Sequence, residues 1–229
     1  MAAPYRVLHS NRAVLRGRMH TGAHCAVPWQ GCLICDSSGA PSSSLVWTQV
    51  VLGVMWCLHY GRRALESVCL FKFHRTRDWS ERLAFLWYGT TAFWIGLSVA
   101  GGPRPQAWLV GVGLTVFLIG EAGNAVCHVM LTRQRAQGVR AQALGISASR
   151  HVIPHGFAFE VLAVPHYVFE WVAWVGFFLA TFTLATLFFA VASFLVMAPR
   201  AREADRLMRK EFGDEYAKLG RKVFIPGIV

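Results

Sequence analysis

An apolar block close to the C-terminus limits the possible folds of this chain more than any other feature. The block covers residues 168–197, which is longer than the roughly 20 apolar residues that a helix needs to cross a bilayer. Three further runs with few or no charges precede it, at residues 45–60, 83–102 and 107–131. The composition agrees, with 55% apolar and only 15% charged residues. The sequence therefore predicts an all-α fold, a polytopic membrane helix bundle.

The last block permits either one strongly tilted helix or a tight hairpin that turns near residues 181–186. The formal net charge of +11 is concentrated in two connections, residues 62–82 and 133–150, and in the segment after Arg200. Basic connections on one side of a bilayer follow the positive-inside rule. The hairpin places all three basic segments on the same side, and we therefore expect about five spans.

The segment after Pro199 is expected to form a C-terminal surface helix, residues 200–212, because its charges follow an amphipathic pattern. The basic residues flank the expected spans and do not form a stripe on a soluble face. Nucleic acid is therefore not an expected partner.

Residues 1–44 differ in composition from the rest of the chain. Their first acid is Asp36, which follows four arginines, and Ser, Gly and Pro cluster at residues 37–44. Such a segment is typical of an organellar targeting sequence, and with so little core-forming material it can also be held by a partner protein. We expect a basic N-terminal extension at 1–44 and a membrane domain at 45–229.

The cysteines do not predict a metal centre. Cys32 and Cys35, with Cys25 and a nearby histidine, provide ligand types that suit zinc. Their spacing lacks the paired form of a zinc knuckle, which favours a disulfide or free thiols. No metal is expected.

Glu121, Asn124 and His128 are spaced so that they share one helix face. Hydrocarbon cannot solvate a carboxylate, an amide and an imidazole, so this face must point into the bundle. Either the three residues form interhelical hydrogen bonds, or they form the polar wall of a ligand site. The spacing alone does not choose between these interpretations.

Arg62, Arg63 and Glu66 form a second polar group at the end of the first span. A pair of arginines there is typical of snorkelling side chains. With the other basic connections on the same side, it also offers a site for an anion, since guanidinium groups match phosphate oxygens bidentately. No glycine-rich dinucleotide fingerprint follows a strand, which excludes a Rossmann fold as the holder of a cofactor.

Tyr167 lies at the entrance of the last apolar block, and Glu170 follows one helical turn later. A tyrosine in this place can be an interfacial anchor. It can also be a proton donor, because the phenol keeps its proton at neutral pH.

Four segments in this order resemble the steroid 5α-reductase superfamily, and most closely its very-long-chain trans-2-enoyl-CoA reductases. They are residues 59–66 (HYGRRALE), Gly123-Asn124 with His128 and Arg135, residues 153–170 (IPHG through Tyr167 and Glu170), and residues 212–216 (FGDEY) with Ile225-Pro226.

The resemblance implies an integral membrane enzyme that uses NADPH to reduce an activated carbon–carbon double bond. The substrate would be a long-chain 2-enoyl-CoA or a steroid-like enone, supplied from the bilayer. By motif position, the catalytic residues would be Tyr167, Arg62 and Arg63. The residues that line the cofactor would be Asn124, His128, Arg135, Glu170 and Tyr216. The resemblance also implies that the protein is located in the membrane of the endoplasmic reticulum.

The chain departs from the family pattern in three places. Residues 164–166 read Val-Pro-His where the family usually has Cys-Pro-Asn, and Thr132 stands where an arginine is expected. The family also carries an earlier span with a glutamate, whereas no acid precedes Asp36 here. These departures motivate an alternative, a catalytically silent accessory subunit of a larger complex, with the mitochondrial inner membrane as its compartment.

Overall fold

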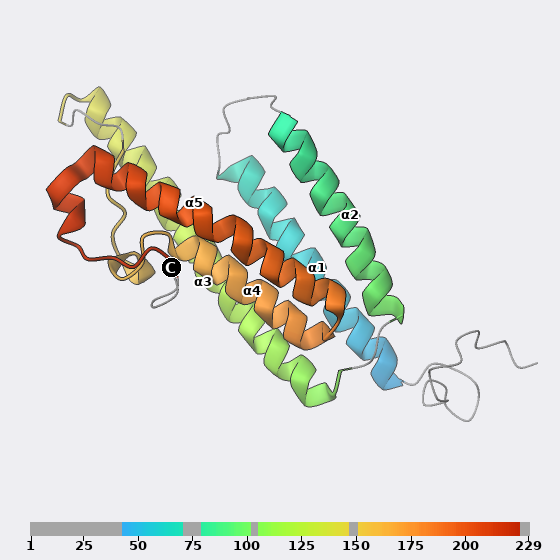
Figure 1. Ribbon diagram of the computed structural model, residues 1–229. Coiled ribbons are helices and arrows are strands. Elements are labelled where there is room, and N and C mark those ends of the chain that lie inside the picture. Colours follow the sequence, from blue (N-terminus) through green and yellow to red (C-terminus); the bar gives the residue numbers. More distant parts are fainter. Residues whose placement is uncertain (1–42, 71–78, 102–104, 147–150, 225–229) are drawn as a thin grey trace, which may run out of the picture. The chain divides into compact units, whose positions relative to one another are not determined.

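The computed structural model describes residues 43–70, 79–101, 105–146 and 151–224. Within these ranges the chain is helical, apart from connecting segments and one isolated bridge between Leu162 and Lys222 (Figure 1). The elements are α1 (Ser43–Cys69), α2 (Trp79–Gly101), α3 (Ala107–Ala143), the 3-10 turn η1 (Phe157–Glu160), α4 (Pro165–Thr181) and α5 (Leu184–Ala217). The all-α prediction is confirmed. Cys32, Cys35 and the features expected of the N-terminal extension lie outside the described residues.

A tight turn between α4 and α5 divides the last apolar block. Helix α4 starts with Pro165, whose missing N–H suits the first helical position. The turn contains Phe182 in the left-handed conformation (φ 48°), and the Thr183 side chain then accepts a hydrogen bond from the Thr186 N–H at 3.3 Å. This threonine cap begins α5. The predicted hairpin near residues 181–186 is therefore confirmed.

Residues 200–212 are helical as predicted, but they do not form a separate helix. Helix α5 runs through Pro199 and changes direction only at Gly213, which has φ 53° and ψ −127°. A proline inside a helix removes one backbone hydrogen bond, but it does not end the helix here. The expected surface helix at residues 200–212 is therefore the continuation of α5 and not a separate element.

Two helices in the part of the chain that the structure describes are long and apolar enough to cross a bilayer, namely α3 and α5. Helix α4 has 17 residues, which corresponds to the lower end of the length range of spanning helices, about 17–25 residues. The number of spans thus stays a prediction.

Helices α3 and α4 pack closely because small residues line their contact (Figure 1). A Cβ atom added to Gly176 of α4 would lie 2.3 Å from the backbone nitrogen of Phe117, and one added to Gly120 of α3 would lie 2.4 Å from that of Ala173. No side chain fits at such a separation, so the two backbones touch directly. This contact fixes the height of α3 against α4, and with it the position of the polar residues on both helices.

The C-terminal segment returns to the start of α4. The Ala163 N–H donates to the Lys222 carbonyl oxygen, and the Lys222 N–H donates to the Val161 carbonyl oxygen, both at 2.8 Å. Phe224 is fully buried in a cluster with Val164 and residues of α5. Lys222 and Phe224 therefore lie against the segment before α4 and against α5.

Candidate functional site

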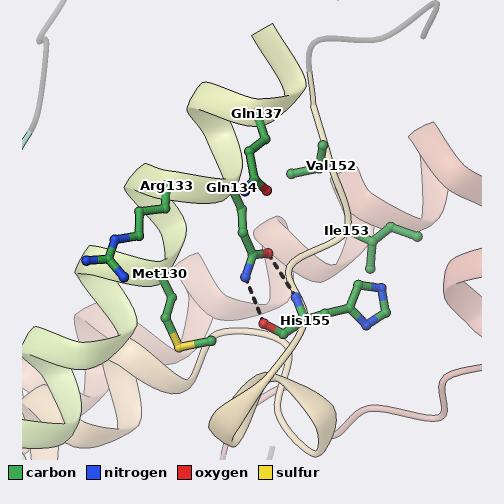
Figure 2. Close-up of a pocket in the computed structure, with 7 residues that line it drawn as sticks. All are labelled: Met130, Arg133, Gln134, Gln137, Val152, Ile153 and His155. Carbon is green, nitrogen blue, oxygen red and sulfur yellow. Dashed lines mark hydrogen bonds between the residues drawn. The ribbon is translucent and has the colours of Figure 1, made fainter. Parts of the chain in front are cut away.

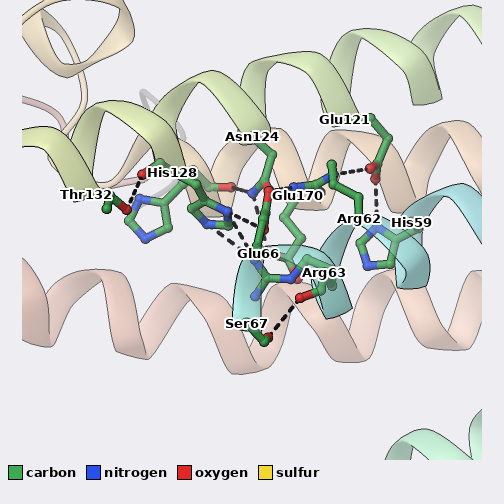
Figure 3. Close-up of polar contacts among 11 residues, drawn as sticks. His59, Arg62, Arg63, Glu66, Ser67, Glu121, Asn124, His128, Thr132 and Glu170 are labelled. Atoms are coloured by element: carbon green, nitrogen blue, oxygen red, sulfur yellow. Dashed lines mark hydrogen bonds and ion pairs between the residues drawn. The ribbon is translucent and has the colours of Figure 1, made fainter. Parts of the chain in front are cut away.

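Two polar stripes face each other across the contact between α1 and α3 (Figure 3). Helical spacing places the four polar residues of α1 on one face, and the same holds for the three of α3. The α1 stripe consists of His59, Arg62, Arg63 and Glu66, and the α3 stripe of Glu121, Asn124 and His128. We refer to these seven residues as the polar network.

Glu121 binds two cationic or potentially cationic groups of α1. Its Oε1 lies 2.6 Å from Nδ1 of His59, and its Oε2 accepts a hydrogen bond from Nε of Arg62, also at 2.6 Å. The residues His59 and Glu121 are only 3% and 4% exposed. The pair is therefore removed from solvent. In such a buried environment ionic hydrogen bonds are stronger than in water, and a charge without a partner is costly.

Glu66, one helical turn after Arg62 and Arg63 on α1, is the second carboxylate of the network. Its carboxylate accepts hydrogen bonds from Arg62 and from Arg63, the latter at 2.9 Å, and its Oε2 lies 2.8 Å from Nδ1 of His128 on α3. Two carboxylates thus face two guanidinium groups, which balances the charge while the imidazoles are neutral. The polar network joins α1 to α3.

Asn124 links the network to α4. Its Nδ2 donates a hydrogen bond to the backbone carbonyl oxygen of His166 at 2.7 Å and lies 3.5 Å from Oε2 of Glu170. The asparagine is fully buried. Through this residue, the first turn of α4 is brought to the same place as the α1 and α3 stripes.

Four buried polar atoms around this junction have no hydrogen-bond partner among the described residues. They are Oη of Tyr60, Nη2 of Arg62, Oδ1 of Asn124 and Nδ1 of His166. Buried polar groups in proteins are almost always satisfied, so these atoms are available to a bound molecule. Donors and acceptors occur together, which fits a ligand that carries amide and phosphate groups, as a nicotinamide dinucleotide does.

The resemblance did not assign a role to Tyr60, although the residue lies within one of its motifs. The Tyr60 ring lies 5.1 Å from the His59 ring and 6.4 Å from the Tyr88 ring, measured between centroids. The Glu170 carboxylate is close enough to interact electrostatically with both tyrosines. The hydroxyl of Tyr60 is thus a buried donor without a partner beside the polar network. Its position directly after His59 in the α1 stripe was the available sequence signal.

Most of the predicted site residues converge, and three do not join the hydrogen-bonded network. Arg62, Arg63, Asn124, His128 and Glu170 come together, as Figure 3 shows.

The remaining three lie in other surroundings. Arg135 is exposed on the polar end of α3. The Tyr167 ring packs in the cluster with Val164 and Phe224, 4.4 Å from the His166 ring. Tyr216 is buried, and its hydroxyl donates to Oδ1 of Asp205 at 3.0 Å.

The pairing between α1 and α3 was not predicted. Spacing predicts the shared face of the α3 residues, and the sequence indicates Arg62, Arg63 and Glu66 as a second polar group, but it does not predict that the two groups meet or that His59 takes part. The interhelical interpretation of the α3 stripe is confirmed for Glu121 and His128. Oδ1 of Asn124 has no partner among the described residues, and the interpretation as a ligand site stays a prediction.

Comparison with known proteins identifies the family. The sequence profile of the 3-oxo-5-alpha-steroid 4-dehydrogenase family matches residues 82–229. The chain therefore belongs to this family, in the steroid 5α-reductase superfamily that the motifs resemble.

Individual relatives fall into two groups. The chain is 32% identical over 186 residues to the very-long-chain enoyl-CoA reductase of Dictyostelium discoideum, a match that covers 79% of this chain and 58% of that protein. It is 30% identical over 190 residues to the human 3-oxo-5-alpha-steroid 4-dehydrogenase 2, covering 78% and 68%. It is 27% identical over 204 residues to the bovine 3-oxo-5-alpha-steroid 4-dehydrogenase 1, covering 86% and 75%. The chain thus spans little more than half the length of the Dictyostelium enoyl-CoA reductase.

Proposed function

We propose that this protein is an integral membrane reductase that uses NADPH to reduce an activated carbon–carbon double bond in a lipid substrate. Membership of the family supports the reaction class. The relatives named as very-long-chain enoyl-CoA reductases and as steroid dehydrogenases support a long-chain 2-enoyl-CoA or a steroid-like enone as the substrate. The length and apolar composition of α3 and α5 support the proposal that the protein lies in a bilayer and takes its substrate from it. The proposed topology keeps about five spans.

The observation that carries this proposal is the set of buried, unpaired polar atoms at the junction of α1, α3 and α4. Asn124 offers an acceptor and Arg62 a donor there, and His128 and Glu170 complete the wall. Arg135, at the polar end of α3, would meet a phosphate group. When bound, NADPH would supply the hydride.

The protein itself must supply a proton, and two tyrosines are candidates. The resemblance assigns this role to Tyr167, which stays a prediction. The geometry favours Tyr60, because its hydroxyl is buried and has no partner among the described residues, whereas the Tyr167 ring packs against an apolar cluster. A buried phenol keeps its proton at neutral pH and can donate it as negative charge develops on the substrate.

Turnover by the purified full chain tests the proposal. The protein in neutral detergent is expected to oxidise NADPH when a long-chain 2-enoyl-CoA or a steroid enone is added. Tyr60→Phe is expected to abolish turnover, and its melting temperature in detergent checks that the variant is folded. If Tyr167→Phe abolishes turnover and Tyr60→Phe does not, Tyr167 is the donor. Absence of turnover above that of the variant lacking both hydroxyls rejects the enzymatic proposal.

The alternative is a catalytically silent accessory subunit, favoured by one observation. The carboxylates of Glu66 and Glu121 already bind Arg62 and Arg63, so these cations also act as internal ties between helices. Under this alternative the protein would co-purify stoichiometrically with other subunits and would not bind NADPH. The endoplasmic reticulum is the proposed compartment from the resemblance, and the mitochondrial inner membrane belongs to the alternative, on the composition of residues 1–44.

A further inference from the structure

A cavity lies on a different face of α3 from the polar network (Figure 2). Its volume is about 450 Å³, and it is lined by Met130, Arg133, Gln134, Gln137, Val152, Ile153 and His155. The four residues from α3 follow helical spacing and share one face, whereas the network residues of that helix follow another. The cavity is therefore separate from the candidate reductase site.

The wall of this cavity is preformed. The Gln134 side chain donates from Nε2 to the His155 carbonyl oxygen at 2.8 Å, and its Oε1 accepts from the His155 N–H at 2.9 Å, the two dashed lines of Figure 2. Gly156 next to it has φ 86°, and a Cβ there would lie 2.8 Å from Cε of Met130. These contacts hold the segment at Val152–His155 against α3 without help from a ligand.

The chemistry of the lining fits an anion attached to a short apolar group. Arg133 provides a guanidinium, and no ion pair joins it to an acid among the residues described. Gln137 adds an amide, and Met130, Val152 and Ile153 add apolar surface. No acid is among the lining residues of the cavity, and the carboxylate of Glu160 lies 3.7 Å from Nδ1 of His155. A guanidinium without a carboxylate beside it matches the oxygens of a phosphate ester.

The position of the cavity suggests where such a phosphate comes from. The apolar run of α3 ends at Leu131, and polar residues follow from Thr132 onward. Met130 and Arg133 thus straddle the boundary between apolar and polar sequence, which corresponds to the headgroup level of a bilayer. Basic pockets at this level bind anionic headgroups, and the volume falls within the range of small-molecule sites.

We propose that the cavity between α3 and the segment Val152–His155 binds the phosphate group of an anionic amphiphile, with Arg133 as its main ligand. The same chemistry occurs in a phospholipid headgroup and in a soluble phosphate ester. The binding does not depend on the reductase reaction.

Native mass spectrometry of the full chain, released from nanodiscs that contain phosphatidylglycerol and phosphatidylcholine, tests this site. The unmodified protein is expected to retain phosphatidylglycerol. Arg133→Gln is expected to weaken retention about tenfold, the effect of losing one charged hydrogen-bond donor to an anion. Arg140→Gln, an exposed arginine two turns further along α3 and outside the cavity lining, is the matched control and is expected to stay within twofold.

A second arm separates the two sources of phosphate. Glycerol 3-phosphate added to the detergent-solubilised protein is expected to compete with the lipid only if the phosphate alone is recognised. If either ligand binds the unmodified protein and binds Arg133→Gln more weakly, the proposed phosphate site is supported. Gln137→Leu provides an independent variant, because it removes a polar lining group without altering charge, and it is expected to weaken binding less than Arg133→Gln. If Arg133→Gln retains both ligands as the unmodified protein does, the proposal is wrong.

Discussion

Nδ2 of Asn124 donates a hydrogen bond to the backbone carbonyl oxygen of His166 at 2.7 Å, and this contact joins the middle of α3 to the first turn of α4. The carbonyl is in a helix, so its second lone pair receives the asparagine donor. The other end of the amide, Oδ1, is buried without a partner. One side chain thus both connects two helices and offers an acceptor to a ligand.

Asn124→Leu is expected to separate these two roles. Loss of one neutral hydrogen bond costs about 1 kcal/mol of unfolding free energy, which a shift of the thermal midpoint in detergent would measure. NADPH binding, followed by fluorescence, is expected to fall much further, by about tenfold or more. Asn124→Asp should be less stable than Asn124→Leu, since it places a second carboxylate beside Glu170. Unchanged NADPH binding in both variants would remove Asn124 from the cofactor wall.

Glu121 is expected to be the residue of the polar network to which stability is most sensitive. Glu121→Gln leaves the half-buried Arg62 guanidinium without one of its two carboxylates, and breaking a fully buried ion pair costs about 3–5 kcal/mol, which is the upper limit here. Glu203→Gln is the matched control, because Glu203 forms an exposed pair with Arg206, and exposed pairs contribute about 0–1 kcal/mol. Thermal unfolding in the same detergent compares the two. Equal midpoints would contradict a buried charge network.

The close approach of α3 and α4 predicts different outcomes for two glycines. Gly176→Ala would place a Cβ 2.3 Å from the Phe117 backbone nitrogen, and overpacking of this kind typically costs about 1–3 kcal/mol. Gly111→Ala meets nothing within 4 Å and is expected to be neutral or slightly stabilising, because alanine is the better helix former. A lower melting temperature for Gly111→Ala than for Gly176→Ala would rule out the described contact.

The turn before α4 is expected to depend on pH through Glu160. The Gly156 N–H donates to its carboxylate at 2.5 Å, and this hydrogen bond lowers the pKa of Glu160, with a smaller contribution from the charge of His155. A carboxyl whose pKa is lower in the folded state stabilises the fold above its unfolded pKa, and the stabilisation is lost as pH falls through the folded value.

Comparison with Glu160→Gln measures this contribution. The unmodified protein should melt above the variant near neutral pH, and the difference should disappear on acidification to below the usual range of carboxyl pKa values. Glu215→Gln, at an exposed position of α5, is expected to show no such dependence. A Glu160 difference that persists at low pH would point to a contact other than the ionised carboxylate.

The amino-acid sequence determined the helices and much of the composition of the site. Long apolar runs cannot avoid helical structure in lipid, since every backbone polar group must be paired within the segment. The threonines at residues 181–186 mark the turn between α4 and α5. Helical spacing places Glu121, Asn124 and His128 on one face, and the sequence also indicates Arg62, Arg63 and Glu66 as a polar group, but not His59.

Only the tertiary structure decided which stripes meet and which tyrosine is free. Spacing along one helix shows which residues share a face, but His59 and Glu121 are 62 residues apart, and the meeting of their faces follows from packing between helices. The glycine contact between α3 and α4 sets the level at which Asn124 reaches His166. The same packing leaves the Tyr60 hydroxyl buried without a partner among the described residues and places the Tyr167 ring against an apolar cluster. Neither the residue type nor the local sequence distinguishes the two tyrosines in this way.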